Sequence, residues 1–420
     1  MAITNKRKIV NDPVYGFLTI EDDVVFDVIS HPAFQRQRRI KQLGFTYLVY
    51  PGATHTRFGH MLGALNLMRR ALEVLRVKGV GITDTEMVAA QLAILLHDVG
   101  HGPFSHTSEF VIAEVHHEEL TQLYMQRIKS DLHRVFWGRY DEVMDMAIQI
   151  FDDSYPKRFL HQLVSSQLDM DRLDYLSRDS FFTGVSEGVV GTERIINMLN
   201  VYDDELVIDE KGIYSVEKFI ISRRLMYWQV YLHKTVVAAD ALLLNILRRA
   251  RYLLSRGEEL RGSVYLIDFL SHHYTRQSFD DRPELLDQFM MIDDSDIIAT
   301  IKGWMLHQDR ILSILADQLI NRHLYAMRVS DTPFAIDTID DYRQCVQERY
   351  GITPQDSEYF VGTGILRNHA YDFNDPEIKV LFKNGSCSDI SEASDQLDRH
   401  FLEKQVTKYY IYFPKFCKEK

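Results

Sequence analysis

The stretch His97-Asp98-Val99-Gly100-His101-Gly102-Pro103-Phe104-Ser105-His106 decides the fold of this chain. The mostly apolar run from Val88 to Leu96 leads into it and predicts a buried helix that ends at its first two residues. The two glycines and the proline then stop the helix and bend the chain. Histidines and an aspartate at a buried helix end cost free energy unless they are paired or bind a metal. The stretch therefore indicates a functional site inside a helical body.

The composition is that of an ordinary globular protein. The chain has 420 residues, of which 46% are hydrophobic and 26% charged, and its formal net charge is −12. On length alone we expect about two to three domains. The acidic balance disfavours a non-specific nucleic-acid binder, which usually carries a basic patch. A small anionic substrate stays possible, because a few local Arg and Lys side chains are enough to bind it.

The cysteines and the N-terminus suggest a cytoplasmic protein. Cys345, Cys387 and Cys417 lack CxxC spacing, so we expect neither a disulfide framework nor a cysteine zinc site. Met1 to Lys8 lacks the apolar core of a signal peptide. No apolar run reaches the ~18 residues that span a membrane, so we expect no membrane contact.

Hydrophobic periodicity predicts a mainly α fold. A short hairpin is expected over 8–20, around an Asn-Asp-Pro turn, and a second over 205–214 with its turn at 210–212. The expected helices cover 33–43, 57–77, 84–97, 108–114, 118–130, 159–178, 192–199, 215–255, 258–271, 282–291, 294–307, 308–321, 342–350 and 393–405. Strand-like pieces at 326–329, 359–361, 378–382 and 406–413 predict a smaller α+β C-terminal region.

This pattern divides the chain into three parts. Residues 1–50 form an N-terminal arm and first helix, 51–325 a helical body with its metal core at about 51–180, and 326–420 the C-terminal region.

Four side chains in the body are candidate metal ligands. His97 and Asp98 lie at one helix end, His60 lies on the preceding helix, and a fourth ligand could come from 167–175. Each residue taken singly is more often a structural or surface group than a ligand. Together, two imidazoles and two carboxylates suit Mn²⁺, Fe²⁺ or Zn²⁺ better than Ca²⁺, and Mg²⁺ remains an option.

In order along the chain, His60, His97-Asp98 and Asp171 resemble the signature of the HD-domain metal-dependent phosphohydrolases. The runs 57–60, 97–106 and 171–179 are similar to the branch that hydrolyses deoxynucleoside triphosphates, and the similarity covers roughly 8–240. The resemblance implies a helical HD core and one divalent metal held by these four residues. It also implies hydrolysis of a deoxynucleoside triphosphate to deoxynucleoside and triphosphate.

The resemblance also implies roles for other residues. His101, Glu109 and His117 match the acid/base group, with Glu109 standing where the family carries Asp. Arg172 stands where the family usually has Lys. The implied substrate-binding residues are Gln42, Leu43, Arg57, His106, Arg172, Tyr175, Asp179, Arg223, Tyr231 and Lys234. Asp171, Tyr175 and Asp179 are spaced four apart, which places them on one helix face. The tyrosine would pack on the sugar, and Asp179 would accept a hydrogen bond from its 3′-hydroxyl.

Partners follow less directly from the sequence. The resemblance implies a homodimer or homotetramer. Lys8, Asn11, Gln35 and Arg38 match a family site for activating nucleotides, but Ser30 and Asn200 depart from it, and Ser30 lacks the carboxylate that would read guanine. Two alternatives remain: an HD enzyme for another nucleotide or phosphate ester, and a nucleotide- or nucleic-acid-binding protein with little turnover. The basic run 36–41 supports the second.

Overall fold

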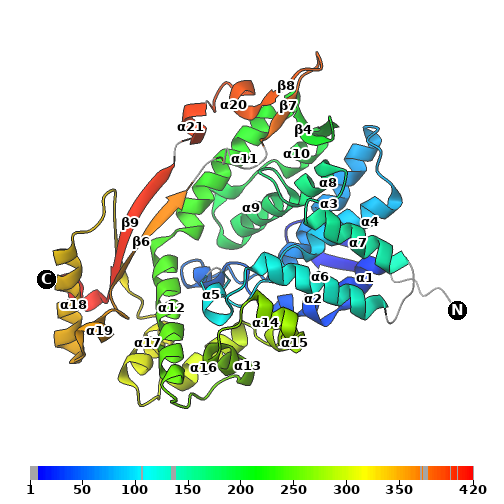
Figure 1. The fold of residues 1–420 in the computed structure, drawn as a ribbon. Coiled ribbons are helices and arrows are strands. Elements are labelled where there is room, and N and C mark those ends of the chain that lie inside the picture. Colours follow the sequence, from blue (N-terminus) through cyan, green and yellow to red (C-terminus); the bar gives the residue numbers. More distant parts are fainter. Residues whose placement is uncertain are drawn as a thin grey trace.

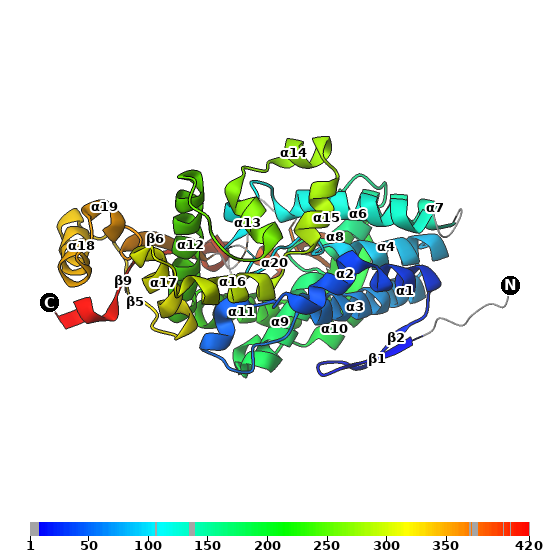
Figure 2. The same cartoon turned by 90° about the horizontal axis from the view of Figure 1, so that it is seen from below.

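The computed structural model describes residues 8–105, 107–133, 139–368, 371, 377–397, 399–403 and 405–419. The predicted fold class is confirmed: a helical body, a short N-terminal hairpin and a smaller α+β C-terminal region. The helical body makes up most of the molecule; the C-terminal residues 336–368 and 406–413 project from one side of it, whereas 379–393 lie against the body (Figure 1). In the view from below, the hairpin of β1 (Lys8–Asp12) and β2 (Gly16–Ile20) lies at the end opposite the C-terminal region (Figure 2).

The first half of the body is a set of helices around one apolar core. They are α1 (Asp23–Ser30), α2 (Pro32–Arg36), α3 (Arg57–Val77), α4 (Asp84–Leu96), α5 (Glu109–Ile112), α6 (His117–His133), α7 (Arg139–Phe151), α8 (Arg158–Val164), α9 (Met170–Thr183) and α10 (Thr192–Met198). Helix α4 is buried along nearly its whole length, as its apolar run predicts. Its N-terminus has a capping box between Thr83 and Glu86. The sequence analysis did not anticipate α7.

Two predicted helices of this half are shorter than expected. The helix expected over 33–43 ends at Arg36 and continues as a 3-10 turn, because Ile40 is extended and Lys41 forms a β-bridge with Thr56. The helix expected over 159–178 is two helices. The Asp169 side chain accepts from the backbone N–H of Arg172 at 2.7 Å, so it caps a new helix where the sequence suggested a helix interior.

The second predicted hairpin was placed wrongly. Strands β3 (Leu199–Tyr202) and β4 (Glu205–Asp209) pair with each other, and the turn lies at Asp203 and Asp204. Both turn residues have positive φ, 53° and 60°, which a tight hairpin turn requires and which Asp tolerates better than most residues. The expected turn at 210–212 is instead a 3-10 entry into the next helix.

The long helix expected over 215–255 is also broken. Helix α11 (Ile213–Met226) passes into a π-helical turn, Tyr227–Tyr231, and α12 (Lys234–Ser255) follows after a bend of 55°. The His233 ring accepts from the N–H of Thr235 at 3.2 Å and so starts α12 afresh. The body is completed by α13 (Val264–Ser271), α14 (Arg276–Asp281), α15 (Glu284–Met290), α16 (Asp294–Trp304) and α17 (Arg310–Ile320).

The C-terminal region contributes to two sheets. Strands β5 (Ala326–Ser330), β6 (Gly362–Asn368) and β9 (Val406–Phe413) form an antiparallel sheet in the order β5-β9-β6. Strands β7 (Lys379–Leu381) and β8 (Cys387–Asp389) instead return to the body and extend its hairpin into the sheet β3-β4-β7-β8. The remaining helices are α18 (Ile336–Tyr350), α19 (Pro354–Ser357), α20 (Ile390–Ala393) and α21 (Arg399–Glu403), so the helix expected over 393–405 is interrupted.

One expectation about the cysteines is wrong. Cys345 on α18 and Cys417 near the end of the chain form a disulfide, whereas Cys387 is free. The two bridged residues are 72 positions apart, and only the packing of the C-terminal turn on α18 brings them together. Among the described residues, no single helix has the length and apolar character to cross a membrane. The two helical segments 210–231 and 234–255, which meet at a bend, reach that length and apolar character only when taken together.

Candidate active site

The four predicted metal ligands converge at the start of α3, the end of α4 and the start of α9. His60, His97 and Asp98 offer ligand atoms that all lie within 4.8 Å of one another. Asp171 lies beside them, with Oδ1 3.0 Å from His60 Nε2 and 3.3 Å from His97 Nε2. Residues that are 111 positions apart in the sequence (171 − 60) thus meet at one buried point.

Neighbouring groups orient both imidazoles for metal binding. His97 donates from Nδ1 to the carbonyl of Ile94 at 2.6 Å, and His60 donates from Nδ1 to Asp174 at 2.7 Å. Nε2 is therefore the ring nitrogen left to bind a metal in each residue, and such outer partners are typical of metal-binding histidines. Both Nε2 atoms are buried and make no hydrogen bond with the described residues. The donor set of two nitrogens and two carboxylates fits a divalent transition metal.

The charges within the cluster are strongly coupled. Burial alone would favour neutral forms of both residue types. The Asp171 and Asp174 carboxylates outweigh burial and raise the pKa of His60 to about 10, so a cation bound at Nε2 would compete with a proton there. For Asp98, burial is outweighed by His97 and Arg57, which hold the pKa of this carboxyl well below its usual value. The site thus keeps its carboxylates ionised in a buried place, as cation binding requires.

Several buried polar atoms without hydrogen-bond partners lie on predicted site residues. Among the described residues they include Gln42 Oε1, Arg57 Nε and Arg223 Nε, in addition to the two imidazole nitrogens. Native proteins satisfy nearly all buried polar groups, so each unsatisfied atom needs a partner such as water, an ion or a ligand. The unpaired atoms on the predicted site residues are compatible with ligand binding there.

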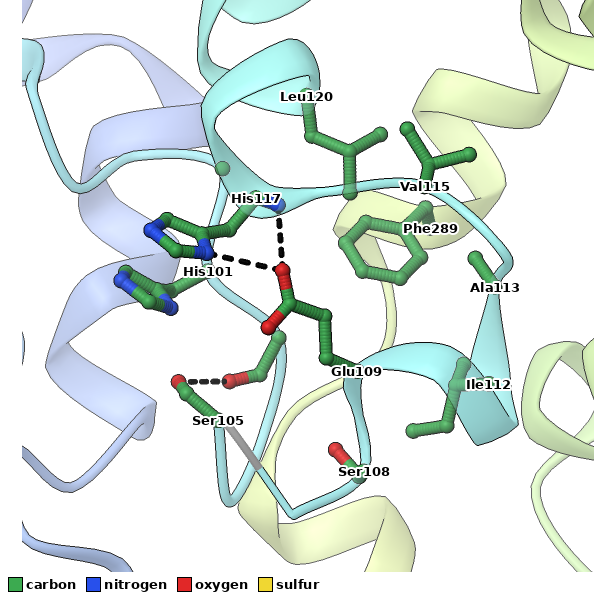
Figure 3. Close-up of a pocket in the computed structure, with 12 residues that line it drawn as sticks. His101, Ser105, Ser108, Glu109, Ile112, Ala113, Val115, His117, Leu120 and Phe289 are labelled. Carbon is green, nitrogen blue, oxygen red and sulfur yellow. Dashed lines mark hydrogen bonds and ion pairs between the residues drawn. The ribbon is translucent and has the colours of Figure 1, made fainter. Parts of the chain in front are cut away.

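The predicted acid/base group forms one cluster beside the metal ligands (Figure 3). His117 donates to the Glu109 carboxylate from Nδ1 at 2.9 Å and from its backbone N–H at 2.6 Å. The His101 ring stacks on the His117 ring, with centroids 3.9 Å apart, and His101 Nε2 lies 3.3 Å from Asp98. Phe289, Leu120 and Ile112 line the apolar side of this small pocket. The cluster thus touches the metal-ligand group through His101.

The pKa values of Glu109 and His101 in this cluster are both lowered, but for different reasons. Burial opposes ionisation of Glu109, but its hydrogen bonds from His117 lower its pKa to about 2. For His101, burial comes first and the positive charge of Arg57 second, and together they lower its pKa well below the usual value. Glu109 is therefore a fixed anion that orients His117.

The predicted phosphate-binding residues differ in what they contact. Arg57 donates to Asp98 and, at 3.0 Å, to the Ser105 hydroxyl, so it lies between the metal ligands and the glycine-rich stretch. Arg172 pairs with Asp169 at 3.1 Å, and Arg223 lies over the Tyr227 ring at 5.9 Å. Leu43 is half-buried, and Lys234 is exposed at the start of α12. His106 lies outside the described residues.

The residues of the predicted sugar face of α9 contact Tyr231 of the π-helical turn. The Tyr175 ring meets the Tyr231 ring edge to face, with centroids 6.1 Å apart. Asp179 is only 1% exposed and accepts from the Tyr231 hydroxyl at 2.7 Å. Its other oxygen accepts from His55 Nε2, also at 2.7 Å. His55 was not predicted as a site residue; its local signal in the sequence is its place five residues before His60.

Three more residues support the site and were not predicted to do so. Asp174 pairs with Arg178 at 2.9 Å and also orients His60. Arg36, which is 1% exposed, donates to the carbonyls of His101 at 2.8 Å and Ile292, so it holds the glycine-rich stretch in place. Gln37 donates to the carbonyl of Val99 at 2.9 Å and does the same.

The basic run 36–41 is not a free cationic surface. Arg36 is buried, Arg39 pairs with Asp293, and Lys41 pairs with Asp294 at 3.4 Å. Arg38 lies over the Phe58 ring at 3.5 Å. These contacts remove the observation on which the nucleic-acid-binding alternative rested.

Comparison with known proteins agrees with this geometry. The HD domain profile matches residues 57–179, and the HD associated region profile matches residues 190–261. The solved structure of a phosphohydrolase from Bacteroides thetaiotaomicron superposes with a TM-score of 0.92 at 48% identity, covering 97% of this chain and 99% of that one. YwfO of Bacillus subtilis is 32% identical over 98% of this chain and 93% of its own length. Human deoxynucleoside triphosphate triphosphohydrolase SAMHD1 is 28% identical over 58% of this chain and 44% of its own length.

The chain belongs to the HD-domain phosphohydrolases. HD domains bind divalent metals, and His60, His97 and Asp98 are placed to hold one.

Proposed function

We propose that this HD phosphohydrolase hydrolyses deoxynucleoside triphosphates to deoxynucleoside and triphosphate. One observation carries the proposal: the ligand cluster of His60, His97, Asp98 and Asp171 is flanked by an acid/base group on one side. Further along α9 from Asp171 lie Tyr175 and Asp179, where a tyrosine ring and a buried carboxylate suit a sugar. The similarity to SAMHD1, a deoxynucleoside triphosphate triphosphohydrolase by name, supports the same substrate class.

The proposed roles follow from the contacts. A divalent metal held by the four ligands would polarise the α-phosphate and favour attack by water. Water attacks the α-phosphorus, the bond from phosphorus to the 5′-oxygen breaks, one proton leaves the water and one reaches the 5′-oxygen. His117, oriented by Glu109, and His101, stacked on His117, lie where they can carry these protons. Arg57 contributes positive charge beside Asp98.

The sugar face favours a deoxyribose. Tyr175 and Tyr231 meet edge to face and leave their rings as an apolar wall, against which the C2′ methylene of a deoxyribose packs. A 2′-hydroxyl against this wall would lose its hydrogen bonds to water, which costs binding free energy. Asp179 lies beneath the wall and supplies acceptors for the 3′-hydroxyl.

The direct test is product analysis. Purified protein is incubated with each of the four deoxynucleoside triphosphates and Mn²⁺, Fe²⁺, Zn²⁺ or Mg²⁺, with and without added nucleotide activators, and triphosphate is separated by ion-exchange chromatography. We expect triphosphate and deoxynucleoside in equal amounts. A parallel panel of nucleoside monophosphates, cyclic nucleotides and ribonucleoside triphosphates tests the alternative substrates.

Two variants make the test specific. Asp98→Asn removes a ligand charge and should abolish product. His161→Phe is the matched control, because His161 lies on α8 and donates to the carbonyl of Ile150 at 2.8 Å. Absence of triphosphate with every deoxynucleotide, metal and activator would overturn the substrate assignment.

A further inference from the structure

Three hydrogen-bonded side chains, two of them buried, join three separate segments at the sugar face. His55 comes from the loop before α3, Asp179 from α9, and Tyr231 from the π-helical turn. The His55 and Asp179 side chains are only 3% and 2% exposed. His55 Nε2 and the Tyr231 hydroxyl each lie 2.7 Å from a different oxygen of Asp179.

The His55 ring is held in one orientation. It stacks on the Phe182 ring, with centroids 4.5 Å apart and planes 17° apart. The loop reaches α9 because Gly52 has no side chain; a Cβ there would lie 2.5 Å from the Phe182 carbonyl oxygen. The stacked ring therefore fixes the direction in which Nε2 donates.

The segment that pairs with this loop carries a predicted substrate residue. The backbone N–H of Gln42 donates to the carbonyl of His55 at 3.0 Å, so the two residues are neighbours on paired segments. Gln42 Oε1 and His55 Nδ1 are buried and make no hydrogen bond with the part of the chain that the structure describes. Unsatisfied acceptors beside a fixed carboxylate are what a hydroxyl-bearing ligand would bind.

We propose that His55 is a positioning residue for recognition of the sugar hydroxyl, acting through Asp179. A carboxylate oxygen accepts more than one hydrogen bond. His55 occupies one position on Oδ1 and Tyr231 one on Oδ2, which fixes the carboxylate plane and leaves acceptor positions for the 3′-hydroxyl. The proposal rests on the proposed function and adds a residue that acts through the Asp179 carboxylate.

The test compares substrates with and without a 3′-hydroxyl. Initial rates are measured for a deoxynucleoside triphosphate and its 2′,3′-dideoxy analogue, using wild-type holoenzyme and the variants His55→Phe and His55→Gln. Phenylalanine keeps the stacking on Phe182 and removes the donor. Glutamine places an N–H donor at a similar reach to Nε2.

We expect wild type to prefer the deoxy substrate in kcat/KM. His55→Phe should lower kcat/KM for the deoxy substrate about tenfold, mainly through KM, since a hydrogen bond to a charged group is lost. It should change kcat/KM for the dideoxy analogue much less. His55→Gln should regain most of the preference. Metal content should stay at the wild-type level in both, and His161→Phe should leave both substrates unaffected.

The possible failures are distinguishable. No triphosphate from wild type would refute the proposed function. Triphosphate without any preference for the 3′-hydroxyl would leave that function standing and overturn the role of His55. Equal preference in wild type and His55→Phe would overturn it as well. If kcat/KM fell equally in His55→Phe and His55→Gln, and for both substrates, His55 would contribute packing only and the proposal would be wrong.

Discussion

At the scale of single residues, the site separates groups that hold charge from groups that move protons. Glu109 accepts two hydrogen bonds from His117 and has a pKa of about 2, so it is ionised at any pH at which the enzyme works. A permanently charged partner keeps the His117 ring in one tautomer and one orientation. Glu109 therefore acts through His117, as a positioning carboxylate.

Replacing this carboxylate by an amide tests that division. Glu109→Gln keeps the shape of the side chain but removes the charge that orients His117. We expect kcat to fall by about a hundredfold, within the range that acid–base catalysis contributes. KM and metal content should change little, because Glu109 does not touch the metal ligands. A variant with wild-type kcat would refute the role.

A second carboxyl makes a separate prediction about stability. Burial raises the pKa of Asp240 on α12 to about 7, against a hydrogen bond from Thr107 that lowers it. The folded protein therefore binds more protons at Asp240 than the unfolded chain does between pH ~4 and pH 7. In that window this residue makes the free energy of unfolding fall as pH rises.

Asp240→Asn should remove that dependence. The variant should gain stability relative to wild type as pH rises from 4 to 7, with a constant difference above pH 7, measured by urea unfolding. Glu259→Gln, at an exposed carboxyl, is the control and should show a flat difference. A difference for Asp240→Asn that does not change with pH would contradict the assignment.

At the scale of secondary-structure elements, the close packing of α3 on α9 sets the metal site. Gly63 lies one turn after His60, and a Cβ on it would lie 1.9 Å from Asp174 Oδ1 and 2.2 Å from Arg178 Nη2. Asp174 bonds to both Arg178 and His60, so separation of the helices would move a metal ligand. Stability and metal binding are therefore coupled at this contact.

Gly63→Ala should expose that coupling. We expect a loss of about 3 kcal/mol in unfolding free energy, from overpacking and from strain on a buried ion pair, together with weaker metal binding. Gly303→Ala is the control, because a Cβ there meets nothing within 4 Å and alanine favours an exposed helix by about 0.5–1 kcal/mol. Urea unfolding and metal analysis measure both effects. A stable Gly63→Ala variant with full metal content would refute the coupling.

The sequence predicted what is encoded locally. The helix that ends at His97, the helix that begins at Arg57 and the strand 406–413 were all expected at nearly their observed bounds, because caps, apolar periodicity and alternation lie within a few residues. The capping role of Asp169 was not predicted, because an aspartate can serve either as a helix cap or as a residue on the surface of a helix. The break at Tyr227–Tyr231 also lacked a local signal; it is fixed by the bond from Tyr231 to Asp179.

The candidate site likewise contains residues that the sequence predicts and residues that only the fold brings together. His60, His97, Asp98 and Asp171 stand in recognisable runs, and their convergence is a matter of packing those helices together. His55 stands near such a run, but only the fold shows that it meets Asp179, 124 residues later. Partners across long sequence separations, including Cys345 and Cys417, were not accessible from spacing.

At the scale of the whole molecule, metal binding should contribute to folding as well as to chemistry. The ligands come from α3, α4 and α9, so a bound cation links three elements of the body. A ligand that binds only the folded state stabilises it by mass action. At a hundredfold excess over Kd the expected gain is about 2.7 kcal/mol.

Chelation followed by calorimetry tests this. We expect Tm to fall on metal removal, to recover on addition of Mn²⁺ or Zn²⁺, and hydrolysis to follow the same course. Asp98→Asn should show little response of Tm to either treatment. Equal Tm with and without metal in the wild-type protein would refute the link.

The sheet β3-β4-β7-β8 has a consequence for how the chain is made. Val207 on β4 pairs with Lys379 on β7, a separation of 172 residues (379 − 207). At about 5–20 residues per second, β4 leaves the ribosome roughly 10–30 s before its partner. During synthesis one edge of β4 is open, and open edges invite pairing with other chains. Strand β7 thus completes the sheet at the edge of the helical body. A nascent chain that stalls before residue 379 would leave the β4 edge exposed, where it could pair with neighbouring chains on the same polysome.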